Sequence, residues 1–397
     1  MTCIELDYKL AELPSAQHRA GLAGLVLIVN ELRQQPWFFE RDNPVVKFIY
    51  ISEYSATLKL NLEGLKALFD LAYKALIKES ATNKKRKKTV NKKKVDREPE
   101  RIDEGSDQPF IYYDPLPHGA FLSSCDKSMD GLWINLWRDM LFKIVKVKSA
   151  SRTRFKDRMG GIFYDKDAEK LWQELQNLEK VVDISGSYLL GAESKNTEMI
   201  KTQDKLKYKF ILQFWVFVTQ VYRPAKLDKE GERKLWWQEG KTNFSWYAVA
   251  IPDVANLIDF CEEFQSVLEA RGIEKYGTLP REAVIDIPEE GALDLLRLLK
   301  QRISRETGSQ TLEDLILGVE LIHVERNDSD NKTKILSISY VEPIISQVDR
   351  YTEIQKAYWC PWFRKQRLLN LLNSKPESNL PDALLNEIPG WIGFDAV

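Results

Sequence analysis

The chain has 397 residues, with 58 lysines and arginines against 59 aspartates and glutamates, so its formal net charge is −1. This length is enough for two or three domains and a sizeable core, and a hydrophobic content of 44% predicts a folded globular protein. The near-neutral balance excludes a chain that is basic throughout, so positive potential must be local. Eleven tryptophans are unusually many, and some are expected at interfaces.

Cysteine spacing and hydropathy indicate the compartment. The four cysteines (Cys3, Cys125, Cys261 and Cys360) lie far apart and form no CxxC pair, which fits a reducing compartment without structural disulfides. No signal peptide is visible, and the longest apolar stretch, residues 210–222, is too short to span a bilayer. We therefore expect a cytoplasmic protein with no membrane partner.

The first 79 residues predict a β-α-β-β-α unit. Apolar and charged residues alternate from Ile4 to Leu10, which is typical of a half-buried strand, and Ser15 then precedes a helical pattern that ends before Pro36. Further strands are expected over residues 45–52 and 57–60, followed by a helix that begins at Asn61. This order resembles the start of a ferredoxin-like or RNA-recognition-type unit.

Residues 80–108 contain almost no apolar groups and predict a flexible linker or loop. Its N-terminal half holds a run in which eight of eleven residues are basic: Lys84, Lys85, Arg86, Lys87, Lys88, Lys92, Lys93 and Lys94. Such a run repels itself and cannot pack, so it must lie in solvent or against a polyanion. Nucleic acid is the first partner to test, and an ordinary solvated loop or a localisation-like signal is the alternative.

The remaining chain predicts a central α+β domain over residues 109–290 and a mostly helical C-terminal region, with one hairpin, over residues 291–397. Helices are expected over 132–147, 165–178, 253–271, 292–303 and 351–372, and strands over 244–251, 316–326 and 333–341. Residues 210–221 favour a buried helix, although their β-branched and aromatic content leaves a strand open. The expected class is α+β: a mixed N-terminal α/β domain with a basic flexible insertion, then a partly helical C-terminal region.

Catalytic chemistry has little support in the sequence. The three histidines, His18, His118 and His323, have no second histidine or cysteine at metal-ligand spacing. Gly240-Lys241-Thr242 lacks the earlier glycine of a P-loop, and the acidic loop at 327–331 lacks the glycine and final glutamate of a calcium loop. We therefore expect no catalytic residue, no metal and no cofactor.

A second basic cluster interleaves arginine with small hydroxyl residues around positions 149–154. Arginine binds phosphate through two parallel hydrogen bonds, and serine or threonine adds short ones, which suits contact with a nucleic-acid backbone. The residues expected to make this contact are Arg152, Arg154, Lys156 and Arg158. A solvated helix end is the alternative.

Four stretches resemble the large subunits of type I CRISPR effector complexes (Cascade). They are residues 12–25 (ELPSAQHRAGLAGL), 188–196 (YLLGAESKN), 248–254 (AVAIPDV) and 280–286 (PREAVID). Their spread covers the chain from about residue 4 to 290. Members of this family often end in a helical bundle; here the tail from about Gly291 is short and interrupted by a hairpin, so either a separate small subunit or a truncated bundle is expected.

The resemblance implies a non-catalytic subunit at the 5′ end of the crRNA. It would recognise the protospacer-adjacent motif, help to open the duplex, and present the displaced strand to a helicase-nuclease or to transposition proteins. Its expected partners are crRNA, target double-stranded DNA, and the backbone, 5′-handle-binding and small subunits of the complex. The alternative is a stand-alone RNA-binding protein built on the ferredoxin-like start, and a metal-dependent nuclease is a third possibility.

Two further groups of residues are expected to bind nucleic acid. Gln17, His18 and Arg19 open the first helix, and a helix N-terminus favours phosphate, although a capping turn explains the same residues equally well. Lys195 and Asn196 follow a glycine-containing loop, and asparagine can read an adenine edge.

Overall fold

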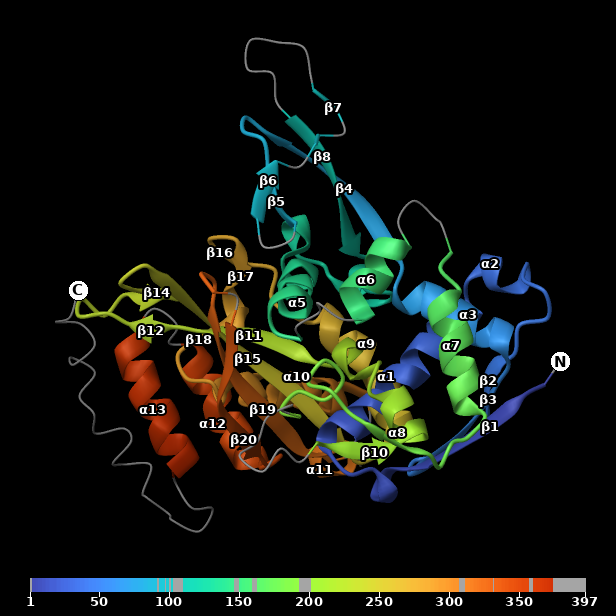
Figure 1. Cartoon of the computed structure of the whole chain (residues 1–397). Helices are drawn as coiled ribbons and strands as arrows, with labels where there is room; N and C mark the ends of the chain where they lie inside the picture. Colours follow the sequence, from blue (N-terminus) through green and yellow to red (C-terminus); the bar gives the residue numbers. More distant parts are fainter. Residues whose placement is uncertain are drawn as a thin grey trace.

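The computed structural model describes residues 2–90, 93–96, 98–99, 101–102, 110–145, 150–158, 163–192, 201–306, 311–330, 332–356 and 360–373. Helices and sheets alternate through this part of the chain, which confirms the predicted α+β class. Figure 1 shows a body of helices and sheets from which one narrow ribbon of strands projects. The body holds two sheets of three or more strands, one N-terminal and one central.

The N-terminal unit has the predicted β-α-β-β-α order. Its elements are β1 (Ile4–Lys9), α1 (Ala16–Arg33), the short α2 (Pro36–Phe39), β2 (Val46–Ile51), β3 (Ser55–Leu60) and α3 (Leu62–Ala72). The sheet is antiparallel in the order β1-β3-β2. Asn61 caps α3, where its side chain accepts a 2.7 Å hydrogen bond from the Gly64 amide. The next strand leaves this sheet, so the ferredoxin-like arrangement stops at three strands.

Helix α1 is buried along almost its whole length, because elements from distant parts of the sequence surround it. Two glycines allow the closest of these contacts. A Cβ atom at Gly21 would lie 2.5 Å from the Ile211 carbonyl oxygen, and one at Gly24 would lie 2.2 Å from the Phe214 carbonyl oxygen. The glycines in the AGLAGL stretch therefore let α1 approach the backbone of residues 211–214.

The projecting ribbon, which we call the arm, occupies the segment that was predicted as a flexible linker. Its described strands are β4 (Ala75–Thr82), β5 (Lys87–Val90), β6 (Lys93–Asp96), β7 (Arg101–Ile102) and β8 (Phe110–Pro117). Long antiparallel pairing joins β4 to β8, and β5 pairs with β6. Paired strands thus replace part of the expected coil, because ladder hydrogen bonds satisfy the backbone without an apolar core.

Helices and short strands link the arm to the central sheet. They are α4 (Leu122–Cys125), α5 (Leu132–Lys143), α6 (Ala150–Asp157), α7 (Lys166–Leu175), β9 (Val181–Asp183), β10 (Gln203–Lys205) and α8 (Leu206–Ile211). The buried helix favoured over residues 210–221 is wrong over most of its length: α8 ends at Ile211, a 3₁₀ turn covers Trp215–Phe217, and strand β11 begins at Gln220. A run of residues buried on every side fits helical and strand spacing equally well, so its pattern does not distinguish the two.

The central sheet has the strand order β18-β11-β15-β19-β20, with β14 also paired to β15. Its strands are β11 (Gln220–Pro224), β14 (Trp236–Glu239), β15 (Thr242–Val254), β18 (Val284–Ile285), β19 (Ile316–Asn327) and β20 (Lys332–Val341). β19 and β20 form the predicted hairpin. Ser245–Val254 of β15 is buried throughout, so both faces of the sheet are covered there. The strands come from both sides of residue 290, where a domain boundary was expected.

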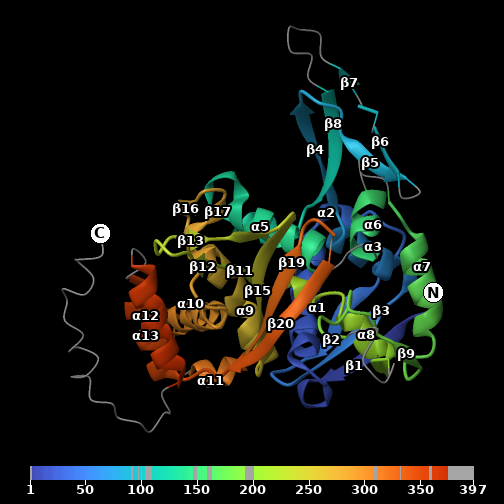
Figure 2. The same cartoon turned by 60° about the vertical axis from the view of Figure 1, so that its left-hand side comes forward.

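The remaining helices pack around this sheet. They are α9 (Leu257–Glu269), α10 (Glu290–Glu306), α11 (Leu312–Leu315), α12 (Ile345–Lys356) and α13 (Pro361–Asn373). Asn256 caps α9, so the helix begins later than the expected residue 253, because β15 continues through Val254. The turned view in Figure 2 shows α10, α12 and α13 side by side, and α12 contacts both of the others.

Candidate nucleic-acid interface

The arm is the structural setting of the first basic run. β4 and β8 pair in register from Ala75 opposite Pro117 to Thr82 opposite Phe110, and both figures show them leading away from the body. At the base of the arm, the His118 amide donates a 2.8 Å hydrogen bond to the Lys74 carbonyl. Burial, together with the charges of Lys74 and Arg138, lowers the pKa of His118, so the His118 imidazole where the arm joins the body is neutral at physiological pH.

The lysines of the basic run and its single arginine, Arg86, have different environments. Lys84 and Lys85 are exposed in the turn after β4, and within the described residues neither pairs with a carboxylate. Arg86 is anchored: its guanidinium pairs with Asp114 and lies 5.0 Å from the centre of the Tyr112 ring. Lys87 and Lys88 belong to β5, but their side chains lie outside the described residues. The described lysines are thus open to a polyanion, whereas Arg86 holds the turn against β8.

The second basic cluster lies on and beside α6, and its last arginine is buried. Arg158 has a 4% exposed surface and makes four polar contacts within the chain. Its Nε donates to Asp70 at 3.1 Å, Nη1 and Nη2 each donate to Asp167 at 3.1 Å, and Nη2 also donates to the Tyr164 carbonyl. The expected phosphate contact at Arg158 therefore does not fit this structure, because carboxylates of α3 and α7 already occupy its guanidinium.

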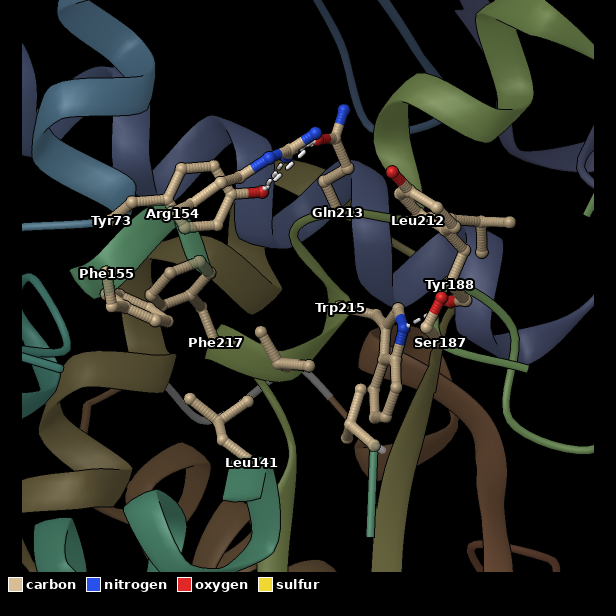
Figure 3. A pocket seen from close by; sticks show the side chains of 12 residues that line it. Tyr73, Leu141, Arg154, Phe155, Ser187, Tyr188, Leu212, Gln213, Trp215 and Phe217 are labelled. Atoms are coloured by element: carbon tan, nitrogen blue, oxygen red, sulfur yellow. Dashed lines mark hydrogen bonds between the residues drawn. The ribbon is translucent and has the colours of Figure 1, made fainter. Parts of the chain in front are cut away.

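Arg154 is also largely covered, with 13% of its side chain exposed. It donates a 2.7 Å hydrogen bond to the Tyr73 hydroxyl, pairs with Asp167 at 3.4 Å, and lies 4.9 Å from the centre of the Tyr73 ring. Figure 3 shows its guanidinium between Tyr73 and Gln213. The adjoining cavity measures about 20 Å³, room for about one water molecule and too small for a nucleotide or cofactor. Arg154 thus holds the fold together instead of facing solvent.

For Lys156 and Arg152, the expected contact with phosphate remains a prediction. Lys156 lies on the same helix, with an exposed side chain. The side chain of Arg152 lies outside the described residues, as do Lys195 and Asn196 altogether. Among the described cations of this cluster, only Lys156 faces solvent in the way that a phosphate contact requires.

The start of α1 is a structural junction. Gln17 is 2% exposed and forms two hydrogen bonds with the backbone of Leu190, donating at 2.9 Å and accepting at 2.8 Å. His18, also 2% exposed, has Nε2 2.9 Å from an Asp204 carboxylate oxygen. Arg19 pairs through two nitrogens with Asp253 of β15. The phosphate contact expected of these three residues therefore does not fit this structure, and they instead tie α1 to three other segments.

The buried arginines were missed as structural residues because their partners lie far away in sequence. Asp70 precedes Arg158 by 88 residues and also pairs with Arg41. Burial raises the pKa of Asp70 to about 6, although Arg41 and Arg158 oppose this shift. The sequence held one sign of this pairing: Asp70 lies on the expected apolar face of the helix after Asn61, and a carboxylate at such a position needs a cation.

The described part of the chain contains neither a metal-binding cluster nor a membrane-spanning helix. No group of three or more histidine, cysteine, aspartate or glutamate side chains is placed there to hold a metal ion. None of the helices described is long and apolar enough to cross a membrane.

Two family models together match most of the chain that forms this α+β body and arm. Residues 45–309 match the Type I-B CRISPR Cas8b N-terminal domain, and residues 316–395 match the Type I-B CRISPR Cas8b C-terminal domain. The chain therefore belongs to the Cas8b family, the large subunits of type I-B CRISPR complexes. The search of curated proteins finds no match. The junction between the two matched domains falls just before β19, which joins them in one sheet.

Proposed function

We propose that this chain is the non-catalytic large subunit of a type I-B crRNA-guided complex. In that complex it recognises the protospacer-adjacent motif in double-stranded DNA, supports R-loop formation, and recruits a downstream helicase-nuclease or transposition proteins. Membership of the Cas8b family supports the subunit class. The observation that supports DNA binding by this chain is the arm, a projecting ribbon with Lys84 and Lys85 exposed at the turn after β4.

The arm has the shape and charge for a first contact with a duplex. The β5–β6 pair, which follows the turn with Lys84 and Lys85, is a two-stranded ribbon and is narrow enough for the major groove of B-form DNA. Lysine is a strong but sequence-independent phosphate contact. Arg86 holds the turn to β8 through Asp114 and Tyr112, so the neighbouring lysines are presented from a turn that is anchored to a paired strand. We therefore assign the arm to capture of DNA and general grip, and sequence reading to the assembled complex.

The alternative of a stand-alone RNA-binding protein needs aromatic side chains on the open face of the N-terminal sheet. Strands β1 and β3 carry paired polar groups on that face, and the third strand, β2, adds one aromatic side chain, Tyr50, which is 56% exposed and lies opposite Thr57. The Thr57 hydroxyl donates to Asp7 at 2.7 Å, and Lys59 pairs with Glu5 at 3.0 Å. One tyrosine is fewer than the two or three stacking aromatics of such a module, and the acidic residues beside it repel a phosphate backbone. This surface favours the complex subunit over the RNA-binding module.

Assembly is the first test. The chain is co-expressed with candidate backbone, 5′-handle-binding and small subunits and a crRNA, and is then purified through a tag on this chain. We expect an RNA-containing complex that binds double-stranded DNA more tightly than the isolated chain does. Failure to co-purify any RNA-containing complex would reject the proposed subunit role.

The arm's contribution is tested by its salt dependence. The double variant Lys84→Ala/Lys85→Ala should weaken duplex binding by the complex about uniformly across sequences, and should flatten the plot of log affinity against log salt by roughly 0.9 for each lost phosphate contact. The matched control is Lys166→Ala/Lys170→Ala on α7, where both side chains are also exposed. An unchanged slope in the arm variant, or an equal change in the control, would remove the arm from the interface.

A further inference from the structure

Two adjacent tryptophans stand open to solvent on β14. Trp236 is 57% exposed and Trp237 is 46% exposed. Three tryptophans of the core are buried with their indole N–H groups satisfied: Trp133 donates to Gly272, Trp137 to Val216 and Trp215 to Tyr188. Within the described residues, the indoles of β14 donate to no acceptor. Large apolar rings exposed on a strand at a sheet margin promote aggregation unless a partner covers them.

The strand that carries them is held rigidly. β14 pairs with β15, with Trp236 opposite Ser245 and Trp237 opposite Phe244, and Figure 1 shows β14 at the margin of the body. Just before it, the Arg233 guanidinium donates to both carboxylate oxygens of Asp286, at 2.6 and 3.0 Å. Asp286 is 4% exposed. The rings are therefore presented by a fixed backbone, which lowers the ordering cost of binding a partner.

A surface groove of about 560 Å³ runs along this segment. Its lining combines aromatic, cationic and amide groups: Arg233, Lys234, Leu235, Trp236, Trp237 and Gln238. A stacking ring, a lysine for phosphate and an amide for base edges are the groups that hold an unpaired nucleotide. Because successive side chains alternate along a strand, the two rings lie on opposite faces of β14, so each offers a separate surface to a base.

We propose that Trp236 and Trp237 form a stacking site for the unpaired bases of a single-stranded nucleic acid. This inference rests on the proposed function, since it assumes that the chain works on nucleic acid, but it concerns a different surface from the arm. A single strand that crosses the sheet margin stacks one base on each ring. Lys234, whose side chain is 49% exposed and pairs with Asp228 at 3.1 Å, lies beside this path and adds at most a shared contact to the strand's backbone.

A protein partner fits this surface less well. β14 has four residues, so a strand added along its margin would gain few backbone hydrogen bonds. Charged residues are depleted at the centre of protein interfaces. Here exposed charges of both signs flank the rings closely in sequence: Lys229, Glu230, Glu232, Lys234, Glu239 and Lys241. The mixed charges also predict that stacking, more than phosphate contact, supplies the affinity.

The test measures binding of the purified full chain to a fluorescent 15-nucleotide oligo(dT), to oligo(rU) of the same length, and to an abasic 15-mer that keeps the phosphates. Trp236→Ala and Trp237→Ala should each weaken binding to the base-containing strands about tenfold, since stacking is worth ~1–3 kcal/mol per base. The double variant should lose about a hundredfold. Affinity for the abasic strand and the salt slope should stay unchanged, and Trp→Phe at either position should restore part of the loss.

Trp362→Ala on α13 is the matched control, because this tryptophan is 63% exposed and lies outside the groove. The thermal midpoint of every variant should match the parent, since exposed positions tolerate substitution. Three results would overturn the proposal: no binding of oligo(dT) or oligo(rU) by the parent, an equal loss with the abasic strand, or loss of subunit assembly with strand binding intact, which would assign β14 to a protein partner. The arm's salt slope is independent of each result, so failure here leaves the proposed function standing.

Discussion

The arm and helix α6 carry the two basic clusters of the chain, and the structure uses them in opposite ways. Lys84 and Lys85 face solvent on the arm, whereas Arg158 is buried and Arg154 is largely covered, and both pair with carboxylates of α3 or α7. The difference lies in the carboxylates within reach. Asp70 and Asp167 lie beside the α6 arginines, and within the described residues no carboxylate pairs with the arm lysines.

Residue type also helps to explain why one basic cluster is exposed and the other is buried. The planar guanidinium of Arg158 forms separate hydrogen bonds to Asp70, Asp167 and the Tyr164 carbonyl, which a lysine ammonium could not arrange in one plane. Lysine is strongly hydrated and favours the surface. Two basic clusters of similar density in sequence thus have different roles because one contains arginines that can be buried and paired.

Removing Arg158, which is more buried than Arg154, should give the largest effect. Arg158→Met leaves Asp70 and Asp167 without their shared cation, so the free energy of unfolding should fall by about 3–5 kcal/mol. Urea unfolding of the purified chain measures this loss. Lys156→Met on the same helix is the matched control and should change stability by about 0.5 kcal/mol or less. A loss below 1 kcal/mol for Arg158→Met would contradict a structural role for this arginine.

The buried carboxylate beside it should make stability depend on pH. Burial raises the pKa of Asp70 to about 6 in the folded chain, above its ordinary value of 3.8, while Arg41 and Arg158 lower it and Asp165 raises it. Between these two values the folded state holds a proton that the unfolded state has lost, so stability falls as pH rises from about 4 to about 6. The difference between the parent and Asp70→Asn should follow that fall, with a size of about 3 kcal/mol. A difference that is flat from pH 4 to pH 6, or that rises, would contradict the raised pKa.

The hydroxyl of Tyr73 should matter less. It accepts a 2.7 Å hydrogen bond from Arg154 and donates one of 3.1 Å to Gln213. Tyr73→Phe keeps the ring but leaves these two buried groups short of a partner, which should cost about 1–2 kcal/mol of stability. Duplex binding by the assembled complex should not change. A loss of binding with unchanged stability would instead place Arg154 at the DNA interface.

The N-terminal unit was predictable because its signals are local. Alternation from Ile4 to Leu10, helical spacing after Ser15 and the cap at Asn61 all match the structure. Strand β11 was not predictable, because residues buried on all sides fit either period. The arm also escaped prediction, since its strands depend on backbone pairing between segments as far apart as Ala75 and Pro117.

Site residues were harder to predict than elements. The QHR sequence at the start of α1 is compatible with phosphate binding at a helix N-terminus, and only the three-dimensional fold brings Leu190, Asp204 and Asp253 to it. The exposed pair Trp236 and Trp237 escaped notice for the same reason: an apolar pair in sequence does not reveal that its strand lies at a sheet margin.

The smallest stability effect is expected for the arm lysines, in contrast to the arginines of the α6 cluster. Lys84→Ala/Lys85→Ala removes no ion pair within the described residues, so the free energy of unfolding should change by about 0.5 kcal/mol or less. Arg86→Ala, at the position directly after Lys85, removes the ion pair with Asp114 and the contact with the Tyr112 ring. It should increase hydrogen exchange at the backbone amides of β4 and β8. Exchange that rises in the lysine variant as well would mean that the lysines, like the arginines of α6, are used to hold the fold.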